Sequence, residues 1–362
     1  MLFALGVLLP GGAVMGSRWV LEPVLLSGVC AVVLGCSSTA PDPFGSQGAT
    51  SGAGTTGVGG GFGTTSGGGG DGLSSNFTTY ESGMGPISVA SGQEKTQCIY
   101  ARLENPEPVF VRRFTATLSN ASHHMIVYRS DETQEQPTPE SCLSFSGLLT
   151  GEHAIFIAQQ KQASLLFPTD GDVPIGLKID ANQMLRIEMH YVNASPAAID
   201  ATGKVFIDTV PVDSTITESD LAFWGTQDIN IPPNGSDDTG VKFQQALSAT
   251  KTFALTTHQH HLGTRMRVWQ TDSPDALPPA PLADTSNWSD PPLVLLDPPL
   301  TFPQGNGVFS SSGLAYECEW QNNTPQTVGF GESVNDEMCF LWHYYYPSQG
   351  FQICLDGLCN TK

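Results

Sequence analysis

Short apolar runs recur along this 362-residue chain, and residues that favour turns separate them. After about residue 76, Gly, Pro, Asn and Asp interrupt the apolar residues so often that no stripe with a helical period exceeds roughly two turns. Short runs at this spacing are typical of strands in sandwich proteins. The pattern predicts an all-β protein with two consecutive antiparallel β-sandwich domains.

The predicted strands form two groups on either side of a boundary rich in Pro and Asp near Val210–Ser214. The domains are therefore expected at residues 76–210 and 211–362. In the first domain the predicted strands are Ile87–Val89, Cys98–Leu103, Val109–Leu118, His124–Tyr128, Ala154–Ile157, Ser164–Phe167, Met184–Val192 and Lys204–Val210. In the second domain they are Leu221–Trp224, Phe253–Thr257, Arg265–Trp269, Leu293–Leu296, Leu314–Glu319, Thr327–Phe330 and Met338–Tyr346.

The first 36 residues have the pattern of an export signal. Arg18 precedes an apolar stretch from Val24 to Leu34, and the segment Val33–Cys36 resembles a bacterial lipobox, which implies cleavage before Cys36 and acylation of that residue. The alternative is a plain secretory signal or membrane anchor. Both interpretations predict a mature protein outside the cytoplasm, either lipid-anchored to the bacterial cell envelope or secreted.

Residues 37–75 are dominated by Gly, Ser and Thr. Such a segment buries too little apolar surface to offset the entropy lost on ordering, so it is expected to be a flexible tether. The chain carries 15 basic and 35 acidic residues, a net charge of −20, which argues against nucleic acid as a partner. Contact with a membrane is expected only through the lipid anchor.

The cysteines suit an exported protein. Cys30 falls within the predicted signal and Cys36 is the lipidation candidate. The even number that remains suits disulfides, and the pattern alone leaves their pairing open: Cys98, Cys142, Cys318, Cys339, Cys354 and Cys359. Zinc binding by these thiols is a weaker alternative, because the sequence contains no Cys-x-x-Cys pair.

The segment Thr257–Gly263 contains a His-x-His pair between two runs with strand character. Side chains alternate between the two faces of a strand, so His258 and His260 are expected on one face and His261 on the other. Two imidazoles on one face can hold one metal ion. The alternative is a strand with solvated histidines.

Two further segments carry candidate ligands. His123 and His124 are neighbours, which on a regular strand face opposite ways, so both can reach one ion only at a strand start or a bulge. The alternative is one buried and one exposed histidine. His190 shares a strand face with Arg186 and Glu188, and the alternative for this polar face is exposure to solvent.

Met338 lies in the segment Asp336–Cys339. Methionine in an apolar strand normally fills a core. Its thioether is also a soft ligand that favours Cu(I), so two histidines with one methionine would suit a copper ion that changes oxidation state.

Four motifs in this order resemble the copper type II, ascorbate-dependent monooxygenases, such as peptidylglycine α-hydroxylating monooxygenase and dopamine β-hydroxylase. They are His123–Met125, Glu188–Tyr191, His258–Gly263 and Asp336–Cys339. The resemblance extends over roughly residues 80–355. It implies two jelly-roll-like β-sandwich domains, each with one copper ion.

The resemblance also implies a role for each candidate ligand. It assigns an electron-transfer copper to His123, His124 and His190. It assigns the catalytic, oxygen-activating copper to His258, His260 and Met338. By the same comparison, His153, His261 and His343 are not ligands. The implied chemistry inserts one oxygen atom from O2 into a C–H bond, with ascorbate or another one-electron reductant as co-substrate.

The resemblance further implies two disulfides. Cys98–Cys142 would flank His123 and His124, and Cys318–Cys339 would anchor the strand that bears Met338. The usual family partner of Cys354 is missing from this chain, which leaves Cys359 as its expected partner.

Some positions depart from the peptidylglycine branch. The arginine that grips the substrate carboxylate there is Thr256 here, and two polar groups after the methionine ligand are Phe340 and Trp342. Glu188 and Tyr345–Pro347 are more similar to the dopamine β-hydroxylase branch. The sequence thus predicts a copper-dependent C–H hydroxylase acting on a small molecule with O2. The alternatives are an exported copper-binding protein without turnover and a structural surface protein.

Overall fold

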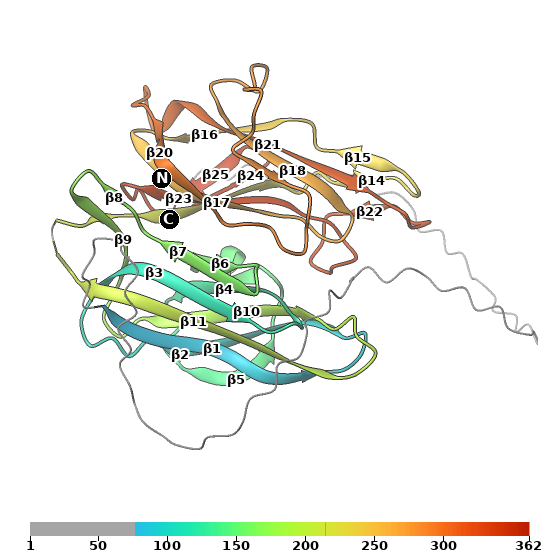
Figure 1. Ribbon diagram of the computed structural model, residues 1–362, viewed down its shortest axis with the longest axis horizontal. Coiled ribbons are helices and arrows are strands. Elements are labelled where there is room, and N and C mark those ends of the chain that lie inside the picture. Colours follow the sequence, from blue (N-terminus) through green and yellow to red (C-terminus); the bar gives the residue numbers. More distant parts are fainter. Residues whose placement is uncertain (1–76, 214, 362) are drawn as a thin grey trace, which may run out of the picture. The chain divides into compact units, whose positions relative to one another are not determined.

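The computed structural model describes residues 77–213 and 215–361. The predicted leader 1–36 with Cys36, and the predicted tether 37–75, lie outside these residues. Strands dominate the described part, which has one short helix, α1 (Ser146–Thr150) (Figure 1). Among the described residues, no helix is both long and apolar enough to cross a membrane. The all-β sandwich prediction is confirmed.

Two sheets form the first sandwich. One follows the order β1 (Thr78–Val89), β11 (Ile199–Pro211), β3 (Val109–Leu118), β9 (Val173–Ile179) and β12 (Thr217–Glu218), with β7 (Gln162–Leu166) beside β3 and β8 (Thr169–Asp170) beside β9. The other follows the order β5 (Gln136–Ser141), β2 (Glu94–Arg102), β10 (Met184–Val192), β4 (Ser122–Ser130) and β6 (His153–Ala158). All of these pairs are antiparallel except β9 with β12.

The second sandwich begins with β13 (Asp220–Thr226). Its first sheet follows the order β20 (Val294–Phe302), β17 (Thr250–His258), β23 (Cys339–Tyr346), β13, β24 (Gln352–Leu355) and β25 (Leu358–Thr361). Its second sheet follows the order β15 (Ser236–Asp238), β21 (Phe309–Gln321), β18 (Gly263–Thr271) and β19 (Ala283–Thr285), with β16 (Lys242–Leu247) beside β21. A small pair joins β14 (Asn230–Ile231) to β22 (Val328–Gly329).

Strand β23 is buried on both faces because it separates two apolar clusters. Side chains alternate along it: Phe340, Trp342 and Tyr344 join a cluster shared with the first sandwich, whereas Leu341 and Tyr345 join the interior of the second. This explains why the strand is almost continuously apolar in sequence. The two sandwiches therefore share the first of these clusters, and burial of each large side chain in it stabilises the fold by roughly 1.5–3 kcal/mol.

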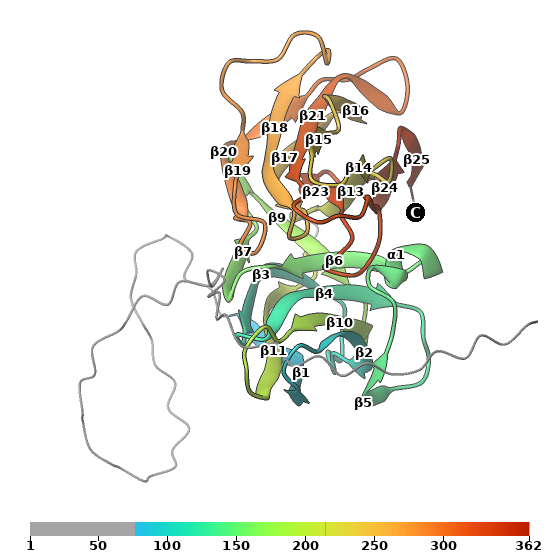
Figure 2. The same cartoon turned by 90° about the vertical axis from the view of Figure 1, so that its right-hand side faces the viewer.

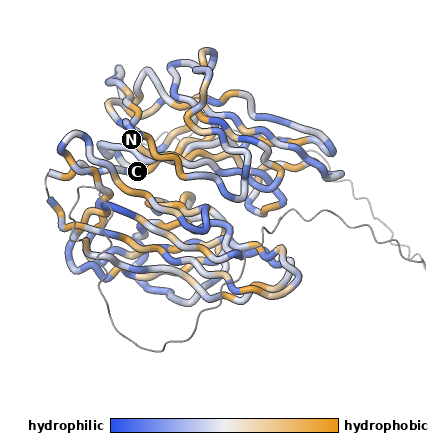
Figure 3. Tube along the Cα trace, in the orientation of Figure 1, coloured by the Kyte–Doolittle hydropathy of each residue, from blue (hydrophilic) through white to orange (hydrophobic). Residues whose placement is uncertain are grey.

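Most other strands alternate apolar and polar stretches (Figure 3). Strand β6 and helix α1 lie on the side of the first sandwich that is nearest the second (Figure 2). Hydrogen bonds also join the two sandwiches directly. Gln159, just after β6, donates to the Thr257 carbonyl over 2.8 Å, and Lys251 forms a 2.6 Å ion pair with Asp170.

The three disulfides of the structure are Cys98–Cys142, Cys318–Cys339 and Cys354–Cys359. These are the pairs that the family resemblance and the missing partner of Cys354 imply. The first joins the start of the segment before α1 to β2, and the second joins β21 to β23. The second disulfide therefore fixes the chain beside Met338, a candidate metal ligand.

Candidate metal centre

The structure brings His123, His124 and His190 together. Each offers a ring nitrogen, and the three nitrogens lie within 4.8 Å of one another. His190 of β10 pairs with His124 of β4, but the next residue, Tyr191, pairs with Ser122. His123 is therefore the extra residue of a bulge, the irregularity that two adjacent histidines need in order to reach one ion. The polar face of β10 is buried, so exposure of His190 to solvent is excluded.

The His-x-His pair lies where β17 ends. His258 is the last residue of the strand, and His260 follows it in an irregular segment. The expectation that a continuous strand carries both residues is therefore wrong in detail, because the chain turns at His261–Leu262 before β18 begins. The two imidazoles still lie side by side, with ring centroids 5.2 Å apart.

Met338 is almost fully buried and immediately precedes β23. It belongs to the apolar cluster shared by the two sandwiches. The carbonyl of Asp336, two residues earlier, lies 3.0 Å from Nδ1 of His260. The segment that carries Met338 is thus fastened to the segment that carries His260.

The two predicted ligand sets adjoin each other. The ring centroid of His258 lies 5.3 Å from that of His124 and 6.2 Å from that of His123. The resemblance assigns these histidines to separate domains, and the packing of the sandwiches places them in one cluster. Trp288 from the second sandwich packs edge-on against His123, with ring centroids 5.4 Å apart.

Burial favours the neutral form of four imidazoles in this cluster, those of His123, His124, His258 and His260. Loss of solvent, followed by repulsion from neighbouring histidines, lowers the pKa of His123, His124 and His258 well below the ordinary value. The same causes lower the pKa of His260 to about 4, although its bond to Asp336 opposes them. A neutral imidazole has a free lone pair, which is the form that binds metals.

Hydrogen bonds select the nitrogen that each ring presents. Nδ1 of His258 donates to the side-chain oxygen of Gln159 over 2.6 Å, and Nδ1 of His260 donates to the Asp336 carbonyl. Nε2 of His190 donates to Oε1 of Glu94 over 2.9 Å. His258 and His260 therefore present Nε2 as a lone pair, and His190 presents Nδ1. Metal-binding histidines are typically oriented by bonds of this kind from their second nitrogen.

The nitrogens left over are buried without a hydrogen-bond partner among the described residues. They are Nε2 of His123, both ring nitrogens of His124, Nδ1 of His190, and Nε2 of His258 and His260. Each unpaired buried polar group costs roughly 1–3 kcal/mol, so a cluster of them destabilises the fold unless a ligand binds there. A donor set of imidazoles together with the buried thioether of Met338 fits copper.

Two carboxylates support the cluster. Burial alone raises the pKa of Glu94, but its hydrogen bonds with His190 and Val334 lower it to about 2. Burial raises the pKa of Glu337 to about 7. Glu337 accepts hydrogen bonds from the backbone N–H groups of Leu262 and His260, at 2.6 and 3.0 Å, and so fixes the turn after the His-x-His pair.

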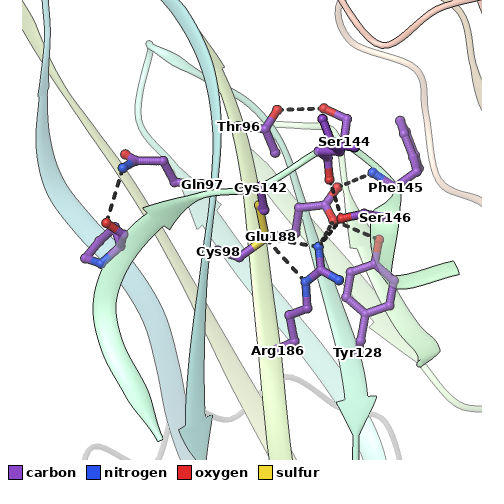
Figure 4. The surroundings of a disulfide bond; sticks show 12 residues. Thr96, Gln97, Cys98, Tyr128, Cys142, Ser144, Phe145, Ser146, Arg186 and Glu188 are labelled. Carbon is purple, nitrogen blue, oxygen red and sulfur yellow. Dashed lines mark hydrogen bonds and ion pairs between the residues drawn. A yellow bond between two sulfur atoms is a disulfide. The ribbon is translucent and has the colours of Figure 1, made fainter. Parts of the chain in front are cut away.

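Aromatic rings form an apolar wall beside the histidines. Phe145 lies 5.2 Å from His124 and 5.3 Å from His258 by ring centroids, and it also contacts Phe340 and Trp342. Its backbone is left-handed, with φ of 58°. Glu188 holds this conformation by accepting a 2.6 Å hydrogen bond from the Phe145 N–H, beside the Cys98–Cys142 disulfide (Figure 4).

The remaining sequence candidates lie outside the cluster or serve other contacts. Thr256 accepts a hydrogen bond from Gln159. His343 is buried against Trp224 and bonds to Thr252. His153 stacks on Phe351, and His261 bonds to the Val334 carbonyl. Arg265 pairs with Asp284, and Arg267 pairs with Glu317 and Glu319. Both arginines are therefore committed to ion pairs on the second sandwich.

Sequence reasoning missed Gln159, Glu94 and Trp288. Gln159 and Trp288 each contact a histidine of the other sandwich, and Gln159 is 99 residues from His258. Glu94 joins His190 of its own sandwich to Val334 of the other. No local spacing connects such residues. Of the supporting residues, Glu337 is the one that the sequence could have indicated, because it precedes Met338 in the motif Asp336–Cys339.

Comparison with known proteins finds a family match over part of the chain. Residues 234–360 match the family described as copper type II ascorbate-dependent monooxygenase, C-terminal domain. This match supports the copper type II ascorbate-dependent monooxygenase family. It includes His258, His260 and Met338 but stops short of the first sandwich.

Solved structures resemble the chain only weakly. PNGase F, a glycosylasparaginase from Flavobacterium meningosepticum, is 11% identical with a TM-score of 0.34, over 76% of this chain and 97% of that one. The major capsid protein P2 of bacteriophage PM2 is 6% identical with a TM-score of 0.26, over 74% and 97% of the two chains.

Replacement of Gln159 by leucine tests the orientation of His258. The change removes the acceptor of the Nδ1–H bond, so we expect copper affinity at His258 and His260 to fall roughly 10- to 100-fold. Competition with a chromophoric chelator measures this affinity. The exposed Gln162 of β7 provides the control, because Gln162→Leu should leave copper binding unchanged. Equal affinities in the Gln159 variant and the unmodified protein would contradict the assigned role.

Proposed function

We propose that this protein is a copper-dependent monooxygenase that hydroxylates a C–H bond with O2 and a one-electron reductant such as ascorbate. The observation that carries the proposal is the cluster of histidines whose buried ring nitrogens lack hydrogen-bond partners within the described residues. The family match over residues 234–360 supports the same chemistry. Copper bound here would supply electron storage at one site and oxygen activation at the other.

The chain's own residues would divide the work between two sites. His123, His124 and His190 would hold the electron-transfer copper through imidazoles alone. His258, His260 and Met338 would hold the copper that meets O2, since a thioether favours Cu(I). Gln159 and the Asp336 carbonyl engage Nδ1 of His258 and His260, which leaves Nε2 of each ring free to bind the metal. The ring of Phe145 packs against His258 and makes this side of the site apolar.

The same wall limits the substrate. A carboxylate that enters an apolar pocket needs a cationic or strongly donating partner, or it loses several kcal/mol of hydration. Thr256 stands where the peptidylglycine branch places its arginine, and Arg265 and Arg267 are already ion-paired with acidic side chains. The expected substrate is a neutral or aromatic small molecule with an activated C–H bond, such as a benzylic one.

A turnover screen tests both the function and the substrate class. The copper-loaded protein is supplied with ascorbate and O2, and oxygen uptake and hydroxylated product are measured. A peptide ending in glycine, its amide and phenethylamine-like compounds are compared. We expect turnover of the neutral or aromatic compounds and none of the free-acid peptide. Efficient hydroxylation of the free acid with an inert amide would show that a carboxylate clamp exists.

The screen also separates the proposal from copper binding without turnover. In that case the protein would take up copper, yet oxygen uptake would not depend on any substrate. We propose in addition that the enzyme works outside the cytoplasm, tethered through Cys36. The three disulfides are the observation in favour of an oxidising compartment.

A further inference from the structure

Glu94 holds groups from both sandwiches with one carboxylate. It lies at the start of β2, and its Oε1 accepts hydrogen bonds from Nε2 of His190 at 2.9 Å and from the Val334 N–H at 2.6 Å. Its Oε2 accepts a third bond, from the Ser333 hydroxyl at 3.1 Å. The side chain therefore joins a candidate ligand of the first sandwich to a turn of the second.

The turn that Glu94 holds, Ser333–Asp336, orients a ligand of the second set, His260. The N–H of Asp336 donates to the Ser333 carbonyl over 2.9 Å, which closes the turn. The carbonyl of Asp336 then fixes His260, and the carbonyl of Val334 fixes His261. Met338 follows two residues later. A short chain of bonds thus runs from His190 through Glu94 and the Ser333–Asp336 turn to His260.

If Glu94 only held the two sandwiches together, the copper affinities of the two sites would be independent of each other. The ion pair between Lys251 and Asp170 shows what such a role looks like, because it also joins the sandwiches at 2.6 Å. It holds strand β17 to the β8–β9 hairpin, through groups other than the candidate ligands. Glu94 differs because its oxygen bonds directly to a candidate ligand and to the turn that orients another.

We propose that Glu94 is a positioning residue that couples the first copper site to the second. The inference rests on the proposed function, since it requires that the histidines hold copper. A carboxylate on Nε2 makes Nδ1 of His190 a stronger donor to a metal. The same carboxylate anchors Val334 and Ser333, so that ordering His190 also orders the turn behind His260. Coupling of this kind acts equally in both directions.

The first measurement needs no copper. Hydrogen exchange at the Val334 amide reports its bond to Glu94 in the metal-free protein. We expect this amide to be protected in the unmodified chain and to exchange faster in Glu94→Ala. Ser333→Ala should have a smaller effect, because it removes one of the three bonds. Unchanged protection in Glu94→Ala would overturn the proposed connection.

The second measurement reads copper affinity at the second site alone. His123→Ala weakens the first site, and its partly exposed position makes the change tolerable to the fold. In this background, chelator competition measures copper held by His258 and His260. Adding Glu94→Ala should lower that affinity about 5-fold or more, although Glu94 contacts neither residue. With all ligands present, the same change should lower first-site affinity roughly 10- to 100-fold.

Two controls make the result specific. Asp170→Asn removes the ion pair with Lys251, a different connection between the sandwiches, and should leave both affinities within about 2-fold, below the range typical of coupled sites. Glu94→Gln keeps one acceptor oxygen and should give an intermediate loss in a protein of nearly unchanged shape. Loss of first-site affinity with an unchanged second site would overturn the inference alone. Failure of the unmodified protein to bind copper would overturn the proposed function as well.

Discussion

Replacement of His258 by alanine is expected to remove one of two bound copper ions and to abolish turnover. His258 presents a buried, neutral Nε2 that lacks a partner within the described residues, and it supplies one of two imidazoles for the oxygen-activating site. Without it, His260 and Met338 are too few to hold the metal. The first three-histidine set stays intact, so one copper ion per chain should remain.

Metal analysis and turnover in the same preparations check this expectation. His343→Gln is the matched control, because His343 is also a buried histidine of the second sandwich with Nδ1 bonded and Nε2 unpaired among the described residues, but its ring packs against Trp224 and Tyr345. That variant should keep two copper ions. Full activity in the His258 variant would refute the assignment of the second site, and loss of both copper ions would show that the sets do not fill independently.

The sequence predicted correctly those strands that have a long apolar run between turn residues. Strands β3 and β10 begin and end as expected, at Val109–Leu118 and Met184–Val192, because both are long and bounded by turn residues. It missed β5, Gln136–Ser141, which contains two prolines, is largely exposed and lacks apolar alternation. Edge strands of this kind are held by backbone bonds to a neighbour, which local composition does not reveal.

The ligand candidates could be identified from the sequence, but their arrangement could not. The sequence indicated a bulge at His123, because two adjacent histidines can reach one ion only there. The pairing of β4 with β10 shifts by one residue at this point and forms the bulge. By contrast, the closeness of His124 to His258 depends on how two sandwiches share the cluster around Phe340 and Trp342. Packing between distant elements also fixes the bonds of Gln159 and Glu94, so no motif contains them.

Met338 shows how the two kinds of information combine. By sequence alone, a methionine before an apolar strand fills a core, and the structure indeed buries it with Phe340 and Trp342. The structure also ties its segment to His260 and to strand β21, because the Asp336 carbonyl accepts a hydrogen bond from His260 and Cys339 forms a disulfide with Cys318. The chain is thus held on both sides of Met338, as either packing or copper binding would require.

Replacement of Met338 separates the two roles. Met338→Leu conserves volume, so it should lower the free energy of unfolding by less than about 1.5 kcal/mol. If the thioether binds copper, this variant should lose the sulfur scattering seen at the copper absorption edge and most of its turnover. Met338→His should still bind copper, because imidazole is a good ligand, yet it should lose most activity with the donor that favours Cu(I). A leucine variant with unchanged copper spectra and turnover would make Met338 a core residue, and the second site would then rest on His258 and His260 alone.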